Sequence, residues 1–167
     1  MLVDNNINLF HGTNSNALPS ILKYGMKSVD ELEKSGITVS TGEEWSRPQG
    51  RSFISFTNDP RIAENYSLMG HSDKKKSFPV IVGISTNDLK NMRTCRVYSD
   101  LPEIGIRDSA PLEYIKFIGV PNENLKYVKR LAKKAKIPVY AIDNILEKDR
   151  PYQMNSWRYR TLFISNK

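Results

Sequence analysis

Short apolar segments rich in branched and aromatic residues recur along the chain and alternate with short helix-like segments. Each has the length of a strand rather than of a helix, and glycine or proline bounds many of them. Neither a G-x-G-x-x-G nor a Walker A pattern accompanies them, so Rossmann and P-loop folds have no motif support. The pattern therefore favours an α+β fold with a mixed or mostly antiparallel sheet core and a few flanking helices.

The elements expected from this pattern can be placed along the sequence. Strands are expected at residues 7–10, 52–57, 78–84, 113–120 and 139–142, with shorter ones at 96–98 and 159–164. Helices are expected after Ser15 or Asn16, over 29–34, after Asp59 and after Pro121, because capping residues and prolines occur where helices begin. Residues 38–51 and 101–111 are expected to form loops.

Bulk composition indicates one globular domain over residues 1–167. Hydrophobic residues make up 39% and charged residues 26%, which suits a single buried core. No apolar run approaches the roughly 20 residues that span a bilayer, and the first residues lack the features of a secretory signal peptide. Cys95 is the only cysteine, which fits a reducing compartment. We expect a cytoplasmic protein, or an effector delivered without a cleavable signal peptide.

The chain is basic, with a formal net charge of +7. Such a balance favours anionic partners and gives no reason to expect a membrane-bound protein. The excess is concentrated in two places, Lys74 to Lys76 and the segment from Lys126 to Lys136. Each can be a solvated face, or a surface for nucleic acid or an acidic protein. No metal site is expected, because the two histidines and Cys95 lack ligand spacing.

The run His11-Gly12-Thr13 follows the first expected strand. The chain has only two histidines, and this one stands beside a glycine that lets a ligand approach the backbone. A histidine at a strand end can also be satisfied by the backbone alone. The segments that accompany it favour the ligand-binding interpretation.

Three segments in order, His11-Gly12-Thr13, the stretch from Gly50 through Phe53-Ile54-Ser55-Phe56 to Tyr66, and Leu112-Glu113-Tyr114-Ile115, resemble the ADP-ribosyltransferase fold. The resemblance is to the histidine-bearing branch related to diphtheria toxin and the poly(ADP-ribose) polymerases, and covers residues 7 to 125. It implies a split sheet and cleavage of NAD⁺ at the nicotinamide–ribose bond.

The resemblance also implies roles for single residues. Glu113 would be the catalytic glutamate, because a fixed carboxylate stabilises the positive charge that develops on the sugar. His11 would be the second catalytic residue and would bind a ribose hydroxyl, and the Gly12 backbone would pair with the nicotinamide carboxamide. The remaining cofactor-binding residues would be Thr13, Ser55, Thr57, Tyr66 and Arg51. Ser55 and Thr57 would support the site by hydrogen bonds, Tyr66 would stack on the nicotinamide ring, and Arg51 would lie at the phosphates. Tyr66 can equally be a core residue, and Ser55 and Thr57 ordinary strand residues.

We therefore expect a monomeric mono-ADP-ribosyltransferase of the small bacterial toxin or effector type, with NAD⁺ as substrate and no metal. Pro111 stands where the arginine-modifying branch carries a second glutamate, which argues against arginine as the acceptor. A protein acceptor is favoured and a nucleic acid is left open. The alternatives are an NAD⁺ glycohydrolase, or an inactive module of the same fold that binds a partner through its basic face.

Overall fold

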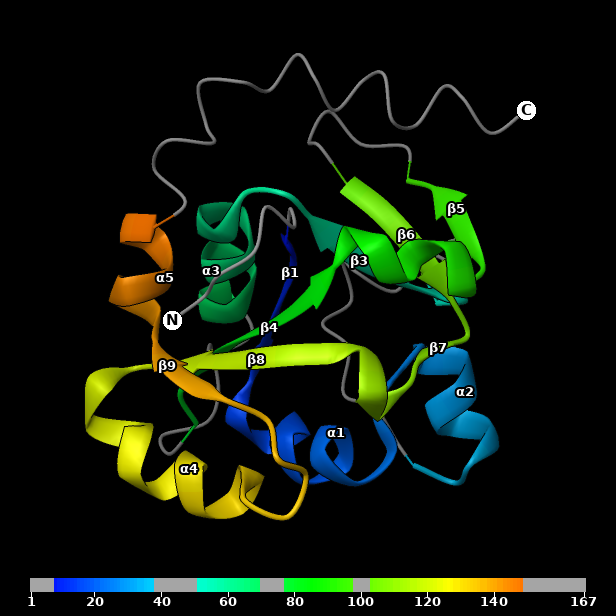
Figure 1. Ribbon diagram of the computed structural model, residues 1–167. Helices are drawn as coiled ribbons and strands as arrows, with labels where there is room; N and C mark the ends of the chain where they lie inside the picture. Colours follow the sequence, from blue (N-terminus) through cyan, green and yellow to red (C-terminus); the bar gives the residue numbers. More distant parts are fainter. Residues whose placement is uncertain (1–7, 38–50, 70–76, 98–102, 149–167) are drawn as a thin grey trace.

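The computed structural model describes residues 8–37, 51–69, 77–97 and 103–148 (Figure 1). The expected 38–51 loop up to residue 50, the lysines at 74–76 and the expected strand at 159–164 lie outside the described residues. Among the described residues, no helix is long and apolar enough to cross a membrane.

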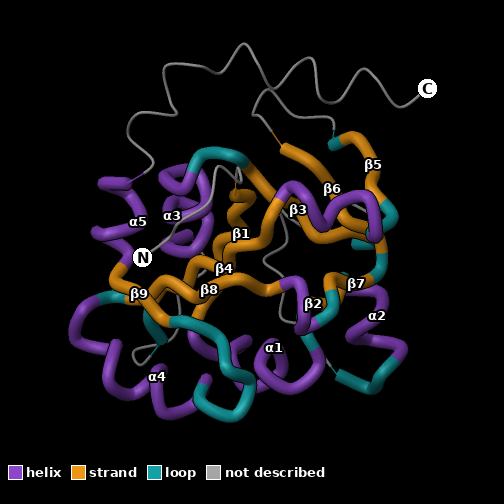
Figure 2. Tube along the Cα trace, viewed as in Figure 1, coloured by secondary structure: helices purple, strands orange, loops and turns teal. Residues whose placement is uncertain are grey.

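Short strands and helices are interspersed along the described chain (Figure 2). The strands are β1 (Asn8–Asn14), β2 (Met26–Lys27), β3 (Phe53–Thr57), β4 (Pro79–Ser85), β5 (Thr94–Arg96), β6 (Glu103–Arg107), β7 (Ser109–Ala110), β8 (Ile115–Val120) and β9 (Val139–Ala141). The α-helices are α1 (Leu18–Tyr24), α2 (Val29–Lys34), α3 (Pro60–Met69), α4 (Leu125–Ala132) and α5 (Ile142–Lys148). Short 3-10 helices are η1 (Ser15–Ala17), η4 (Thr86–Asn91), η5 (Leu112–Tyr114) and η6 (Asn122–Asn124).

In the described part of the chain, seven strands form one sheet in the order β5-β6-β3-β1-β4-β8-β9, and β2 pairs with β7 separately. Every pair of neighbouring strands in the large sheet is antiparallel except β8 with β9. The parallel pair is possible because η6 and α4 return the chain to the same end of the sheet. The expected α+β class with a mostly antiparallel sheet is confirmed.

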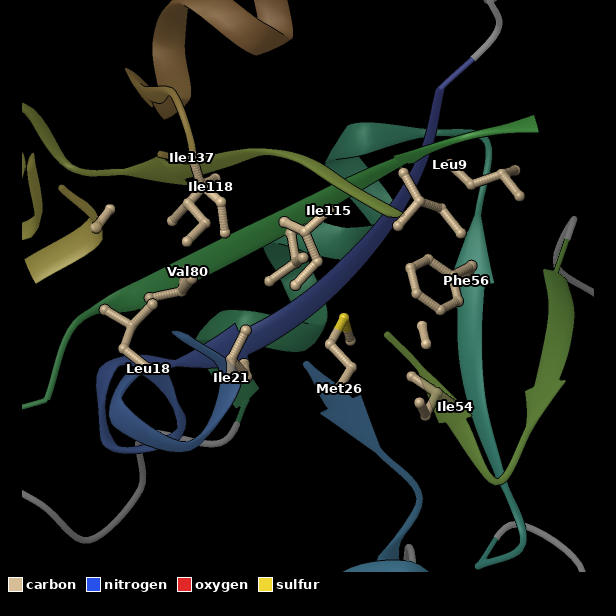
Figure 3. Close-up of a cluster of buried hydrophobic side chains, with 14 of the residues drawn as sticks. Leu9, Leu18, Ile21, Met26, Ile54, Phe56, Val80, Ile115, Ile118 and Ile137 are labelled. Atoms are coloured by element: carbon tan, nitrogen blue, oxygen red, sulfur yellow. The ribbon is translucent and has the colours of Figure 1, made fainter. Parts of the chain in front are cut away.

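Two hydrophobic clusters cover the two faces of this sheet. Leu18 and Ile21 of α1 pack with Val128 of α4 against strand residues such as Val80, a cluster that Figure 3 shows in part. On the other face, the smaller cluster joins strand residues to α3 and α5 (Figure 1), and its buried members are Phe10, Ala63, Ile81, Phe117, Ile142 and Ile145. Strand alternation explains the division, because Leu9 belongs to the first cluster and Phe10 to the second.

Several expected elements are confirmed. The helix α2 has the expected bounds and is capped by the Ser28 hydroxyl, which accepts from the Glu31 N–H. The helix α3 begins at Pro60, and the Asp59 carboxylate accepts from the Arg61 N–H, as the Asp-Pro pair predicts. The helix α1 ends at Gly25, whose φ of +76° is readily adopted only by glycine.

Other expectations are wrong. The first strand continues to Asn14, so His11 lies inside a strand and not at its end. The expected loop at 101–111 contains β6 and β7. Glu113 does not open a strand, because η5 precedes β8 and holds it. The helix α5 was not expected; it begins directly where the last strand ends.

Candidate functional site

The sheet opens between β1 and β3. The strand β1 pairs with β4 along its whole length, but with β3 only at Phe10 opposite Thr57. Beyond β1, the Ser15 N–H donates to the Phe78 carbonyl on the β4 side at 2.9 Å. Backbone groups alternate in direction along an antiparallel strand. The N–H and C=O of Gly12 therefore point toward β3. At this position β1 no longer pairs with β3.

The side chain of His11 replaces the next backbone hydrogen bond that would form between β1 and β3. Its Nδ1–H donates to the Ser55 carbonyl at 2.7 Å. In a continued antiparallel register Ser55 would lie opposite Gly12, and its carbonyl would accept from the Gly12 N–H. That carbonyl accepts from the imidazole instead. The centroid of the imidazole ring lies 5.6 Å from the centroid of the Phe56 ring. The backbone of Gly12 is thereby left facing the gap.

Burial decides the charge of His11, and the Ser55 carbonyl decides its tautomer. Burial lowers the pKa of the imidazole below 6.5, and the Ser55 carbonyl and the Glu103 charge oppose that shift only in part. The ring is therefore neutral near pH 7. Because a carbonyl can only accept, Nδ1 carries the proton, and Nε2 keeps a lone pair for a donor.

The helix α3 lies very close to β1 at Gly12. A Cβ placed on Gly12 would stand 1.8 Å from the Ala63 carbonyl oxygen and 2.8 Å from the Ser67 nitrogen. No side chain fits there, so packing against α3 requires a glycine at this position. The close approach brings Tyr66, the residue before Ser67, beside the gap.

The tyrosine meets a carboxylate that the sequence pattern missed. The Tyr66 hydroxyl is hydrogen-bonded to Glu103, which lies opposite Thr57 at the start of β6. Burial, the Glu103 charge and this hydrogen bond raise the pKa of Tyr66 to about 12, so the hydroxyl remains a donor. The same charge acts on His11. His11, Tyr66 and Glu103 thus form a cluster from β1, α3 and β6, called the gap cluster below.

The hydroxyls expected at the site differ in their partners. The Ser55 Oγ is buried and has no hydrogen-bond partner among the described residues. A buried hydroxyl without a partner is costly and is uncommon in folded proteins. The Thr57 Oγ1 accepts from the Asp59 N–H at 3.1 Å and so helps to begin α3. Thr13 lies opposite Val80 in the β1–β4 ladder and is half-buried.

Arg51 is engaged in ion pairs. Its guanidinium lies 3.4 Å from Asp30 and pairs more closely with Glu33, both on α2. These partners raise the pKa of the guanidinium, led by the hydrogen bond to Glu33. Arg51 therefore links α2 to the chain just before β3 through these ion pairs.

Glu113 is not brought into the gap cluster. It is exposed in η5, which leads into β8, and β4 separates β8 from β1 in the strand order. The glutamate that joins the cluster, Glu103, falls in the segment expected to be a loop. Alternating Ile104 and Ile106, both buried, are the sequence signal for that strand. Among the described residues, no group of three or more metal-binding side chains is assembled.

No protein-family model and no curated protein matches the chain in sequence. Solved structures do match in fold. Thermosipho africanus DarTG in complex with ADP-ribose aligns with a TM-score of 0.63 at 18% identity, over 80% of this chain and 49% of that chain. This chain therefore spans about half the length of that protein.

Two further similar structures are complexes of DarT from Thermus sp. 2.9. The complex with ADP-ribosylated ssDNA aligns with a TM-score of 0.58 at 10% identity, over 84% of this chain and 96% of that one. The complex with NAD⁺ aligns with a TM-score of 0.55 at 11% identity, over 81% and 95%. At these identities the likeness establishes architecture alone, and the chain has a DarT-like ADP-ribosyltransferase fold.

Proposed function

We propose that this protein is an NAD⁺-dependent ADP-ribosyltransferase with Glu103 as its catalytic glutamate. The observation that carries the proposal is the opening between β1 and β3, where His11 takes the Ser55 carbonyl and leaves the Gly12 backbone facing the gap. A partly buried backbone N–H and C=O ordinarily finds a hydrogen-bond partner, and at Gly12 the pairing with β3 does not supply one. The DarT-like fold and the NAD⁺ held by the Thermus DarT support the choice of substrate.

The groups at the gap fit the nicotinamide end of NAD⁺. A carboxamide presents one acceptor and two donor hydrogens, and a strand backbone presents one donor and one acceptor side by side. The Gly12 N–H and C=O would therefore pair with the carboxamide. The His11 Nε2 lone pair would accept from a ribose hydroxyl, and the Ser55 Oγ would gain a polar partner that the described protein does not supply.

Glu103 would supply the charge that the reaction needs. When the bond between the ribose carbon and the nicotinamide nitrogen breaks, its electron pair leaves with nicotinamide, and positive charge develops on the sugar. A carboxylate held beside the gap stabilises that charge, and an acceptor oxygen or nitrogen then bonds to the ribose carbon and loses its proton. Tyr66 holds the carboxylate through its hydroxyl, so it serves as a positioning residue as well as a candidate stacking partner.

The acceptor that we propose is a nucleic acid. The sequence favoured a protein acceptor, with nucleic acid left open. The Thermus DarT, of similar fold, was captured with ADP-ribosylated single-stranded DNA, and this chain carries a net charge of +7, which suits a polyanionic acceptor. Arg51, which the sequence assigned to the NAD⁺ phosphates, is engaged by α2 and has no part in the proposal.

The test is incubation of the full chain with NAD⁺, with and without a mixed single-stranded oligonucleotide. Nicotinamide release is measured by chromatography, and the oligonucleotide is weighed by mass spectrometry. An adduct with the mass of ADP-ribose, absent with Glu103→Gln, is the expected result. Nicotinamide release with no adduct on DNA, RNA or lysate protein would identify a glycohydrolase instead. No release at all, with the chain shown to be folded, would overturn the enzymatic proposal.

A further inference from the structure

The helix α4 carries its cations on one side and its core contacts on the other. Val128 and Ala132 are buried under the sheet. A second stripe of the helix turns away from them, because residues three and four positions apart share a face. Its members are all exposed, and we call them the basic stripe: Lys126, Lys129, Arg130 and Lys133.

The cations of the basic stripe have no ion-pair partner among the described residues. Like charges three and four positions apart on a helix repel each other and weaken it. By contrast, other cations of the described chain are neutralised, such as Arg93 by Asp108 at 2.8 Å and Lys116 by Asp88 at 2.9 Å. The basic stripe is thus a concentration of uncompensated positive charge.

An exposed aromatic side chain flanks the basic stripe. Tyr127 is 53% exposed, more than any other large hydrophobic residue of the described chain. Its ring makes an edge contact with Phe78, with centroids 6.5 Å apart and planes at 84°. This contact steadies the ring from one side while much of it remains open to solvent.

We propose that the basic stripe and Tyr127 together bind single-stranded nucleic acid. Cations that neutralise phosphates and an open aromatic ring on which an unpaired base stacks are the two parts of such a surface. A solvated face would explain the lysines but not the tyrosine among them. A membrane surface would need a wider apolar stripe than Tyr127 and the 38%-exposed Leu131 provide.

The strand register places the start of α4 at the same end of the sheet as the open end of the gap. Gly12 lies opposite Ile81, and Ile81 lies opposite Gly119, so the three residues are level across the sheet. The gap runs from Phe10 past Gly12, and β8 ends one residue after Gly119 and leads through η6 into α4. The helices α1 and α4 lie together at this end (Figure 1). The inference rests on the proposed function in one respect: a nucleic acid bound here would be the acceptor of ADP-ribose.

Binding is tested without NAD⁺, by fluorescence anisotropy of a labelled oligodeoxythymidine of about 20 nucleotides. The test variant is Lys126→Gln/Arg130→Gln/Lys133→Gln. The control, Lys34→Gln/Lys90→Gln/Arg93→Gln, removes as many exposed cations elsewhere, two of which are ion-paired in the structure. The test variant should bind the oligonucleotide more weakly than wild type does. Its slope of log affinity against log salt concentration should be smaller in magnitude by about 2. The control variant should behave as wild type. Equal affinity of the two triple variants would overturn the proposal.

Tyr127 provides the second arm. Tyr127→Leu should weaken binding about tenfold and Tyr127→Phe should not, because phenylalanine keeps the stacking face. Equal binding by the two variants would reduce the surface to a general polyanion site and so contradict the proposal. Thermal unfolding of every variant checks that each is folded.

The surface and the catalytic proposal can fail separately. Nicotinamide release in the absence of oligonucleotide should survive the triple substitution on α4, and oligonucleotide binding should survive Glu103→Gln. Loss of binding in Glu103→Gln would place the nucleic acid at the gap alone and overturn the role of α4. Binding by wild type with no nicotinamide release would leave the surface standing without the enzyme.

Discussion

The Tyr66 hydroxyl in α3 is hydrogen-bonded to the carboxylate of Glu103 at the start of β6. The two residues are far apart in the sequence. They meet because α3 packs closely against β1 at Gly12, which has no side chain to keep the helix away. The tyrosine pKa of about 12 keeps this donor protonated throughout the usual working range. The hydroxyl therefore stays available as a donor to the Glu103 carboxylate.

Tyr66→Phe should lower the rate of NAD⁺ cleavage while leaving the affinity for NAD⁺ nearly unchanged. The ring that could stack on nicotinamide is kept, and the hydrogen bond to Glu103 is lost. A hydrogen bond to a charged group contributes about 1.5–3 kcal/mol, so kcat should fall about tenfold or more. Steady-state measurement of nicotinamide release separates kcat from KM. A rise in KM at constant kcat would show that the hydroxyl only binds substrate.

Glu103→Gln and Glu113→Gln form a matched pair for the catalytic assignment. Both remove one carboxylate charge, from a residue in the gap cluster and from an exposed residue in η5 respectively. Loss of a preorganised electrostatic group lowers rates by about 10²–10³-fold. That loss is expected for Glu103→Gln only, with Glu113→Gln close to wild type. The reverse result would restore the glutamate that the sequence resemblance selected.

Ser55→Ala should separate substrate binding from stability. The Ser55 Oγ is buried without a partner among the described residues, so its removal should leave the free energy of unfolding within about 1 kcal/mol of wild type, or raise it. The stabilisation of the protein by added NAD⁺, read as a shift in Tm, should nevertheless shrink. Thr57→Val is the contrast, since it removes the acceptor of the Asp59 N–H and should cost about 1 kcal/mol without substrate.

Local sequence signals predicted most of the fold. Short apolar runs rich in branched and aromatic residues located β3, β4 and β8, and capping residues located α2 and α3, because these features act within a few residues of one another. The expectations failed where tertiary contacts decide. Gly105, for example, reads as a loop residue, yet β6 holds it against Phe53, and a Cβ on it would stand 2.5 Å from the Cys95 sulfur.

The candidate site was predictable in part for the same reason. His11, Gly12 and Tyr66 could be selected from their order and residue type. The partner glutamate could not, because Glu103 joins them only through the pairing of β6 with β3, which is a long-range contact. Nor does any local pattern reveal that the β1–β3 ladder stops after Phe10, or that α2 engages Arg51.

The His11 pKa predicts a loss of stability in mild acid. Burial holds the folded-state pKa below 6.5, whereas the unfolded chain has the ordinary value. Between the lowered pKa and 6.5 only the unfolded state binds the proton, so the free energy of unfolding should fall as pH falls through that window. Urea unfolding at about pH 7.5 and about pH 5.5 measures this. His11→Gln should flatten this dependence on pH.

Gly12→Ala should prevent the normal packing of α3 on β1. The new Cβ would meet the Ala63 carbonyl oxygen at 1.8 Å, and both partners are backbone, so neither can turn away. Overpacking of this kind costs about 3 kcal/mol or more, and the displaced helix would take Tyr66 away from Glu103. Gly36→Ala is the control, because Gly36 has a φ of +77° but open space around its Cβ. That variant should cost only the local backbone strain of about 1 kcal/mol. Urea unfolding compares the two, and equal losses would mean that the packing of α3 on β1 does not depend on the lack of a side chain at position 12.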